Sequence, residues 1–193
     1  MELRCAWVTK DPEYIEYHDK QWGRPVHDSR ELFAKLCLDG QQAGLSWITI
    51  LKRTESYHRA YADFDPVHIA QFDEQDVARL MQDTGIIRNR LKVQSIIKNA
   101  RAYLALEAQG IDFADYLWGF VGGAPIVNQR QGNGDIPATS AESDAMSKAL
   151  KKRGFTFVGS TICYAFMQAV GMVNDHLVTC PCHTECQQEP ARQ

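Results

Sequence analysis

Cysteines and histidines near the two ends of the chain are residue types that bind metal ions. Three residues lie between His176 and Cys180, a spacing that suits one helical turn or a compact loop. Far upstream, Cys5 and His18 add a thiolate and an imidazole. Two Cys and two His would complete a tetrahedral structural zinc site. Such a site would join the N-terminal arm to the C-terminal tail.

A competing set of metal ligands lies entirely within the C-terminal tail and consists of Cys180, Cys182, His183 and Cys186. Spacing alone does not choose between the two sets, and the same residues could also be reduced and bind no metal. The two remaining cysteines, Cys37 and Cys163, have apolar neighbours in the sequence. We expect them to be small buried hydrophobic residues.

The N-terminal part of the chain combines aromatic side chains with a carboxylate. The rings are Trp7, Tyr14, Tyr17, Trp22 and Trp47, and Asp39 precedes a Gly and two Gln. A carboxylate beside several rings suits a flat cationic heterocycle, because the rings stack on it while the acid accepts its N–H groups. The alternatives are that the rings belong to the hydrophobic core and that Asp39 only ends a helix.

The string ARLMQDTGIIRNRLKVQ predicts a helix, a tight turn and a second helix. We expect Gly85 to adopt a positive φ in this turn. The amides of Ile86, Ile87 and Arg88 should then be free at a helix N-terminus, where phosphate groups bind, and Lys92 would add charge. Any helical hairpin can carry a glycine turn, so the pattern alone is not specific.

The basic residues are segregated along the chain. Residues 84–106 and 145–174 contain nine Lys or Arg and no Asp or Glu, although the formal net charge of the whole chain is −3. Such segregation predicts a positive face for a polyanion such as DNA. Solvated helix faces with a chance clustering of charge are the alternative. A helical RNA-binding module is disfavoured, because the exposed aromatic sheet of common RNA-binding folds is missing.

Length and composition indicate a globular chain. Its 193 residues are 45% hydrophobic and 23% charged, which fits one domain or two lobes that share a core. No apolar run is long enough to span a bilayer, and the N-terminus lacks an apolar signal segment. We therefore expect a cytoplasmic chain without a membrane partner.

Strand patterns are almost absent and helix start and stop signals recur, so the sequence predicts an all-α fold. The second predicted helix, over 43–61, would bury Leu45. A loop near 121–137 contains two prolines and four glycines, which should exclude regular structure there. The other helices are expected at 28–40, from 65, at 73–85, 89–107, 113–119, 139–154 and 160–170.

Long strings of the sequence resemble the constitutive bacterial type I family of 3-methyladenine DNA glycosylases, in the helix-hairpin-helix superfamily. The resemblance rests on CAWVTKDPEYIEYHDKQWG, QQAGLSWITIL, GIIRNRLKVQSIIKNARAY and SKALKKRGFTFVGSTICYAFMQAVGMVNDH. It implies an all-α fold with one structural zinc. It also implies removal of N3-methyladenine from double-stranded DNA by hydrolysis of the N-glycosidic bond, with free 3-methyladenine as product and no lyase step.

The resemblance also implies roles for individual residues. The zinc ligands are Cys5, His18, His176 and Cys180. The base pocket consists of Asp39 and the aromatic residues Trp7, Tyr14, Tyr17, Trp22 and Trp47. Apart from the resemblance, the residues of the hairpin and of the string AGLSW lead us to expect DNA contacts at Gly44, Leu45, Gly85, Ile86, Arg88 and Lys92. The family has a Glu before GQQAGLSW where this chain has Asp39, so hydrogen bonds to the base are expected to lengthen or to run through water.

Chemistry explains why few catalytic groups are visible. N3-methylation leaves adenine positively charged, so the leaving group needs no strong general acid. We interpret Asp112 and Asp115 as helix-cap residues and expect catalysis mainly through extrusion and binding of the base, with Asp39 as electrostatic support. Leu45 is the candidate wedge that fills the gap, unless it is an ordinary core leucine. The alternative function is a zinc-stapled, non-catalytic binder of damaged DNA.

The expected organisation is a single glycosylase unit, possibly with two helical lobes. A hairpin lobe would span about 40–120, and a zinc lobe would combine about 1–39 with 138–186. We expect a monomer in the bacterial cytoplasm.

Overall fold

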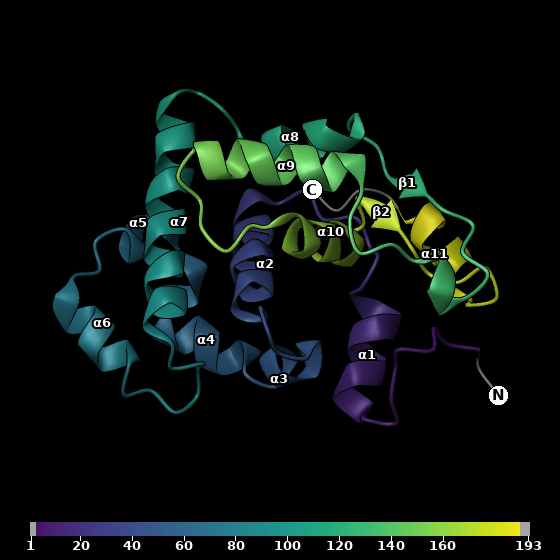
Figure 1. Cartoon of the computed structure of the whole chain (residues 1–193), viewed down its shortest axis with the longest axis horizontal. Coiled ribbons are helices and arrows are strands. Elements are labelled where there is room, and N and C mark those ends of the chain that lie inside the picture. Colours follow the sequence, from purple (N-terminus) through teal and green to yellow (C-terminus); the bar gives the residue numbers. More distant parts are fainter. Residues whose placement is uncertain (1–2, 190–193) are drawn as a thin grey trace.

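The computed structural model describes residues 3–189, and nearly all of its regular structure is helical (Figure 1). This confirms the prediction of a mainly helical chain. The α-helices are α1 (Pro12–Lys20), α2 (Ser29–Gln41), α3 (Trp47–Leu51), α4 (Thr54–Ala60), α5 (Pro66–Ile69), α6 (Glu74–Leu80), α7 (Arg90–Ala108), α8 (Phe113–Trp118), α9 (Ala141–Lys152), α10 (Ser160–Ala169) and α11 (Cys182–Gln188). Three short 3-10 helices are η1 (Ala62–Phe64), η2 (Gly119–Val121) and η3 (Asn133–Asp135).

Helix α2 lies between α7 and α10 and contacts both (Figure 1). Asp28 caps its first turn, because its carboxylate accepts a hydrogen bond of 2.8 Å from the Glu31 amide. Apolar side chains such as Leu32, Phe33 and Leu36 are fully buried. The helix continues one residue beyond Gly40, which we had expected to end it. A Cβ at Gly40 would lie 3.0 Å from the Phe157 carbonyl oxygen, so glycine allows a close approach there.

The prediction of one helix over 43–61 is wrong. The chain forms α3 and α4 instead, and residues 42–46 make a turn before α3 begins. Gly44 has a φ of +79°, a conformation that glycine adopts without strain and that interrupts a helix. As a result, Leu45 lies in the turn with 39% of its surface exposed, not in the core.

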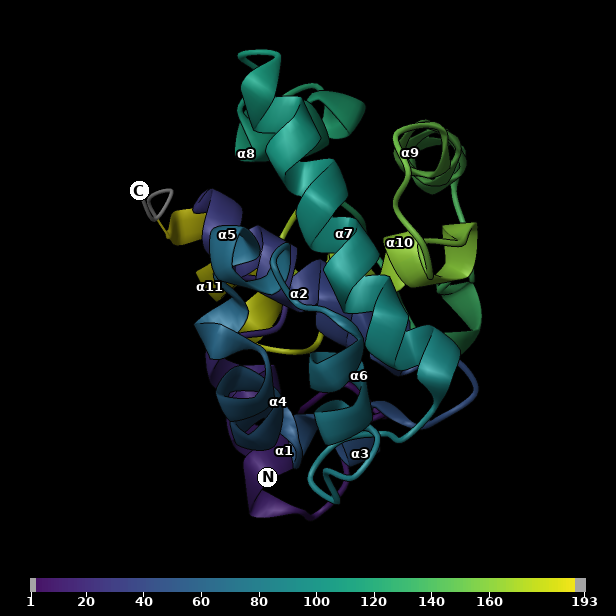
Figure 2. The same cartoon turned by 90° about the vertical axis from the view of Figure 1, so that its left-hand side faces the viewer.

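The predicted helix, turn and helix form α6, residues 81–89 and α7. Figures 1 and 2 show this turn at the same end of the molecule as α3 and α4. The expected positive φ at Gly85 is wrong, since it is not among the glycines with positive φ. A Cβ at Gly85 would lie 2.7 Å from Cβ and Oγ of Ser56. Glycine is therefore needed here for close packing of the turn against α4.

The loop near 121–137 contains regular structure that we did not predict. Strand β1 (Ile126–Val127) pairs in parallel with β2 (Val173–Asn174), and η3 follows within the same loop. A further bridge joins Arg130 to Leu177. Helix α11 was also not predicted. These pairings hold the loop against the segment that follows α10, on the side of the molecule where α11 lies (Figure 1).

Two hydrophobic clusters make up the core of the described residues. The larger one extends from Leu32 to Val173, and the smaller one contains Cys5, Tyr17, Trp22, Ala169, Leu177, Cys180, Cys182 and Cys186. The division of the chain into two lobes stays a prediction. No helix of the described part is long and apolar enough to cross a membrane.

Candidate functional site

Two cysteines and two histidines from the ends of the chain meet in a buried cluster. The ligand atoms of Cys5, His18, His176 and Cys180 all lie within 4.8 Å of one another. Cys5 Sγ is 3.5 Å from His176 Nδ1, and Cys180 Sγ is 3.7 Å from His18 Nε2 and 3.8 Å from His176 Nδ1. In a tetrahedral zinc site, Zn–S of about 2.3 Å and Zn–N of about 2.0–2.1 Å separate the ligands by roughly 3.3–3.8 Å. The four residues therefore fit such a metal.

Neighbouring groups fix both imidazoles of the cluster. His18 Nδ1 is 2.7 Å from Asp19 Oδ1, and Arg4 in turn donates to Asp19. His176 Nε2 is 2.8 Å from the Trp22 carbonyl oxygen. Each ring therefore directs its other nitrogen to the cluster. Metal-binding histidines are usually oriented in this way by a hydrogen bond to the nitrogen that does not bind the metal. A Cβ at Gly23 would lie 2.8 Å from His176 Nε2, so a side chain there would displace this ring.

The two thiols of the cluster differ, because the hydrogen bond to Cys180 and burial raise the pKa of Cys5. Hydrogen bonds from the Cys182 and Cys5 thiols lower the pKa of Cys180, which favours its thiolate. The Leu177 amide donates to Cys5 Sγ at 3.4 Å. A protein metal site uses deprotonated sulfur, so these donors match the needs of a bound cation.

The competing local set does not form a cluster of its own. His183 Nε2 is 2.7 Å from the Asn128 carbonyl oxygen, which places this ring against the 121–137 loop. Cys186 is buried beside Gly23. Cys182 is grouped with His18 and Asp19, at the edge of the four-residue cluster. Spacing in the sequence could not show these positions.

All five predicted aromatic residues and Asp39 line one cavity of about 360 Å³. Trp7 packs against Tyr14 and Trp22, with ring centroids 5.1 and 5.0 Å apart. Tyr17 lies 5.6 Å from Trp47, which begins α3. Burial raises the pKa of the Tyr17 hydroxyl well above its usual value, so this side chain stays neutral.

Asp39 is the charged residue of this cavity, and only 3% of its surface is exposed. Its Oδ1 accepts a hydrogen bond of 3.0 Å from Lys35 Nζ, whereas its Oδ2 is buried and has no partner. Burial raises the pKa of Asp39, and the charge of Lys35 acts against this shift. The indole Nε1 atoms of Trp7 and Trp47 are also buried without a partner. Buried polar atoms are normally satisfied, so these three atoms indicate a ligand with complementary groups.

Sequence reasoning missed several residues of the cavity wall. Polar groups come from Gln42 after α2, from Asn133 in η3 and from Gln168 in α10, and apolar surface comes from Ile136, Ala165 and Ala169. Gln168 Nε2 donates to the buried Asp175 at 2.9 Å. Gln42 belongs to the string QQAGLSWITIL, but no spacing rule indicates that the 121–137 loop reaches this wall.

The hairpin turn differs in detail from the predicted phosphate site. The Ile87 amide donates to the Tyr57 hydroxyl at 3.1 Å, and the Ile86 amide is 3.5 Å from the Asp83 carbonyl oxygen. The prediction that the amides of Ile86 and Ile87 are free is therefore wrong. Arg88 is exposed.

Lys92 is not placed to contact DNA. It is 6% exposed, and its ammonium donates to the carbonyl oxygens of Gln41 and Ala43 at 2.7 and 2.6 Å. The prediction of a phosphate contact at Lys92 is therefore wrong. Its ammonium instead joins α7 to the last residue of α2 and to Ala43, in the turn that also contains Gly44 and Leu45.

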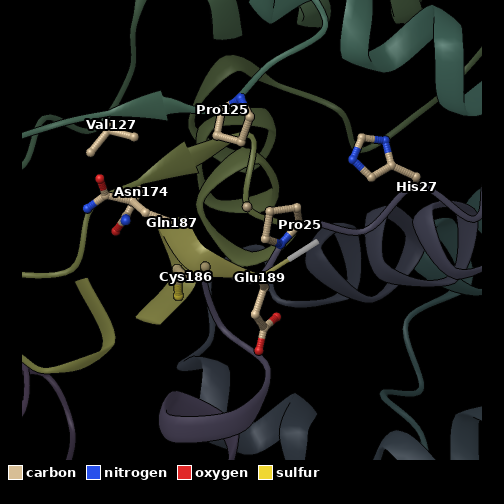
Figure 3. Close-up of a pocket in the computed structure, with 10 residues that line it drawn as sticks. Pro25, His27, Pro125, Val127, Asn174, Cys186, Gln187 and Glu189 are labelled. Carbon is tan, nitrogen blue, oxygen red and sulfur yellow. The ribbon is translucent and has the colours of Figure 1, made fainter. Parts of the chain in front are cut away.

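A second cavity of about 330 Å³ lies between the start of β1, the segment before α2 and α11 (Figure 3). Its wall contains Pro25, Pro125 and backbone at glycines. The one aromatic ring in the wall, His27, already stacks on Trp118 with centroids 4.2 Å apart. This cavity therefore lacks the free aromatic faces that would hold a flat heterocycle.

Comparisons with known proteins agree with the geometry. A family model described as methyladenine glycosylase matches residues 7–183. The chain is 58% identical over 180 residues to DNA-3-methyladenine glycosylase 1 of Escherichia coli K12, which covers 93% of this chain and 96% of the relative.

Solved structures give the same result. A crystal structure of 3-methyladenine DNA glycosylase I is 58% identical, with a TM-score of 0.93, and covers 94% of this chain and 100% of that one. A variant of another 3-methyladenine DNA glycosylase I, in complex with 3-methyladenine, is 41% identical with a TM-score of 0.88. It covers 92% of this chain and 96% of that one.

Proposed function

The chain belongs to the methyladenine glycosylase family, and we propose that it removes 3-methyladenine from DNA by hydrolysing the N-glycosidic bond. The product is an abasic site for base excision repair. The observation that carries this function is the cavity in which five aromatic side chains surround the unpartnered Oδ2 of Asp39. Such a cavity can stack on a purine ring and accept a hydrogen bond from its exocyclic amine.

We further propose that the charge of the base is recognised at Asp39. N3-methylation makes adenine cationic, and the ionised Oδ2 attracts this cation more strongly than neutral adenine. The free indole N–H groups of Trp7 and Trp47 can donate to ring nitrogens. Because Asp39 is one methylene shorter than the Glu of the family, its contact with the base is longer or runs through water.

Catalysis follows from binding rather than from a strong acid. The cationic base leaves without protonation, and the carboxylate of Asp39 provides electrostatic stabilisation near the site of bond cleavage. Asp112 caps α8 by accepting from the Asp115 amide at 2.9 Å, which confirms its interpretation as a helix cap. Neither Asp112 nor Asp115 lines the aromatic cavity.

We assign extrusion of the base to the turn between α2 and α3. Leu45 is exposed, and Gln42 of the same turn lines the cavity, so Leu45 is placed to fill the space that a flipped base leaves. Gly44 has open space around it, which allows a DNA strand to approach its backbone. Helices α6 and α7 with their turn form the proposed helix-hairpin-helix element, with Gly85 and the exposed Arg88 beside the DNA backbone.

We propose that the Cys5, His18, His176 and Cys180 cluster holds one structural Zn²⁺. All four residues are buried and act as ligands, so no open position remains for substrate. The metal would hold the segment around Cys5, α1 and the segment after β2 together beside the aromatic cavity. Its role is therefore to position Trp7, Tyr17 and Trp22. We also propose that the protein acts as a monomer in the bacterial cytoplasm.

The experiment that tests this function is release of the free base. Purified protein is incubated with N3-methylated double-stranded DNA, and the soluble fraction is analysed for 3-methyladenine, with unmethylated DNA as control. We expect 3-methyladenine and abasic sites in equal amounts. Tight binding of the methylated DNA without release would contradict catalysis and favour the non-catalytic damage binder.

A further inference from the structure

Lys35 is a half-buried cation that neither the aromatic cavity nor the metal cluster explains. It lies on α2 one turn before Asp39, and its side chain is 16% exposed. Its Nζ is 3.0 Å from Asp39 Oδ1 and 3.3 Å from the centroid of the Trp47 ring, and it lies 5.3 Å from that of Tyr17. Three residues of the proposed base pocket therefore contact one ammonium group.

The ammonium lies behind the wall of the base cavity, not inside it. Asp39, Trp47 and Tyr17 line the cavity, whereas Lys35 does not. Lys35 instead lines a neighbouring groove of about 640 Å³, and Tyr17 and Ala169 separate the two spaces because they line both. A base in the cavity would thus meet Asp39 from the side opposite to Lys35.

We propose that Lys35 is the positioning residue for Asp39: it holds Oδ1 from behind and so presents Oδ2 to the base as an ionised acceptor. This role rests on the proposed function of Asp39. Lys35 also occupies one face of the Trp47 ring by a cation–π contact, which leaves the opposite face for stacking.

The electrostatic reason is the burial of the carboxylate. An isolated buried carboxyl group becomes neutral, and a neutral Asp39 would not attract a cationic base. Burial does raise the pKa of Asp39, and Lys35 opposes this shift by its charge and its hydrogen bond. The paired charges sum to zero, so the pocket selects its ligand by the placement of one carboxylate oxygen rather than by excess negative charge.

The other titratable groups that face Asp39 cannot take over this task. Helix α1 contributes Tyr17, and burial raises its pKa well above the usual value. Helix α10 contributes Cys163, and burial raises its pKa to about 12. Helix α3 contributes Trp47, which does not titrate. Tyr17 and Cys163 are both neutral at the pH where Asp39 ionises. Lys35 alone therefore changes the balance between the neutral and the ionised form of Asp39.

The test compares Lys35→Met with the wild type. Methionine keeps an unbranched stem over Trp47 and removes the charge. The excision rate on N3-methylated DNA is measured from acidic to alkaline pH, and the Asp39 carboxyl is titrated by carbon-13 NMR. An opposite charge at this distance lowers the pKa of an Asp by about 1–3 units. We therefore expect the acid limb and the NMR titration of Lys35→Met to move to higher pH by about that amount.

Three further variants keep the result interpretable. Lys35→Arg retains the charge and should retain the wild-type acid limb. Lys20→Met changes an exposed lysine of the same groove that pairs with Glu16, and should leave the limb unchanged. In an Asp39→Asn background, Lys35→Met should cause no shift, because the group that Lys35 acts on is gone.

Two outcomes would overturn the proposal. An unshifted NMR titration in folded Lys35→Met would show that Lys35 only packs against Trp47. Tighter binding at every pH with an unshifted limb would show that Lys35 competes with the base. If the wild type released no 3-methyladenine, the proposed function would fail, while the NMR titration would still decide the role of Lys35.

Discussion

Cys5 Sγ lies 3.5 Å from His176 Nδ1, although 171 positions separate the two residues in the chain. This contact joins the N-terminal segment to the segment after β2 directly beside the aromatic cavity. The proposed metal cluster and the proposed base pocket are therefore coupled, because Trp7 and Trp22 lie within a few residues of Cys5 and His18 and Trp22 packs on the His176 ring with centroids 4.6 Å apart.

Replacement of Cys5 by Ser should remove the metal. The variant loses one of four buried ligands, so we expect zinc content to fall from one per chain towards zero and the melting temperature to drop. Elemental analysis and thermal unfolding measure both. The matched control is Cys37→Ala, which alters a buried cysteine on α2, away from the four-residue cluster, and should keep its zinc. Unchanged zinc in Cys5→Ser would refute the assignment of the site.

Asp39→Asn should lose about ten- to a hundredfold in excision rate. The substitution keeps the shape of the side chain but removes a charge-assisted hydrogen bond worth roughly 1.5–3 kcal/mol. Asp39→Glu restores the reach of the family residue and should equal or exceed the wild type if length matters. Single-turnover excision by the three proteins decides the question. Equal rates for Asp and Asn would leave aromatic stacking as the discriminator.

The pH dependence of excision should follow Asp39. Burial raises the pKa of this carboxyl group. Only the ionised form attracts a cationic base, so activity is present above the raised pKa and is lost as the pH falls through it. The acid limb of kcat/KM should therefore lie above about pH 3.9, the value of an ordinary Asp. Asp39→Asn should lack this limb, and its persistence in that variant would assign the limb to another group.

Leu45→Ala should impair excision from duplex DNA more than binding of the free base. Extrusion of a base costs roughly a few kcal/mol, and a wedge in the vacated space offsets part of that cost. We expect about a tenfold decrease on duplex DNA and little change in melting temperature, because Leu45 is exposed. Val67→Ala, at an exposed apolar residue of α5, serves as control. An equal loss in both variants would exclude a specific wedge.

Arg88→Ala and Lys92→Ala should have different effects. Arg88 is exposed at the hairpin, so its loss should weaken DNA binding similarly for all sequences and lower the salt slope by about 1. Lys92→Ala removes two hydrogen bonds to Gln41 and Ala43, so it should mainly lower the melting temperature. Salt titrations of DNA binding and thermal unfolding separate the two roles. A reduced salt slope in folded Lys92→Ala would contradict the structural role.

The sequence allowed the helical class and many helix positions to be predicted, because helix caps are local signals. Asp28 and Asp73 cap their helices by hydrogen bonds to amides two or three residues away. Residues 42–46 show the limit of such signals. The apolar pattern continued across this turn, whereas the backbone of Gly44 interrupted it.

The direction of a charged side chain could not be predicted from its type. Lys92 and Arg88 belong to the same acid-free segment, yet one ammonium is buried against carbonyl oxygens and the other side chain faces solvent. The pairing of Lys35 with Asp39 fits an i, i+4 spacing, but its burial against Trp47 depends on the packing of α3 on α2. Gln168 enters the cavity wall only through the position of α10.

The separation between Cys5 and His176 also has a consequence for biosynthesis. During translation Cys5 and His18 are synthesised first. His176 and Cys180 are present only after the ribosome has passed Cys180. A chain halted before His176 offers only two of the four ligands, so it cannot close the cluster. Capture of the proposed metal would therefore require synthesis through Cys180, and a chain truncated before that point would lack the metal that we propose to position the base pocket.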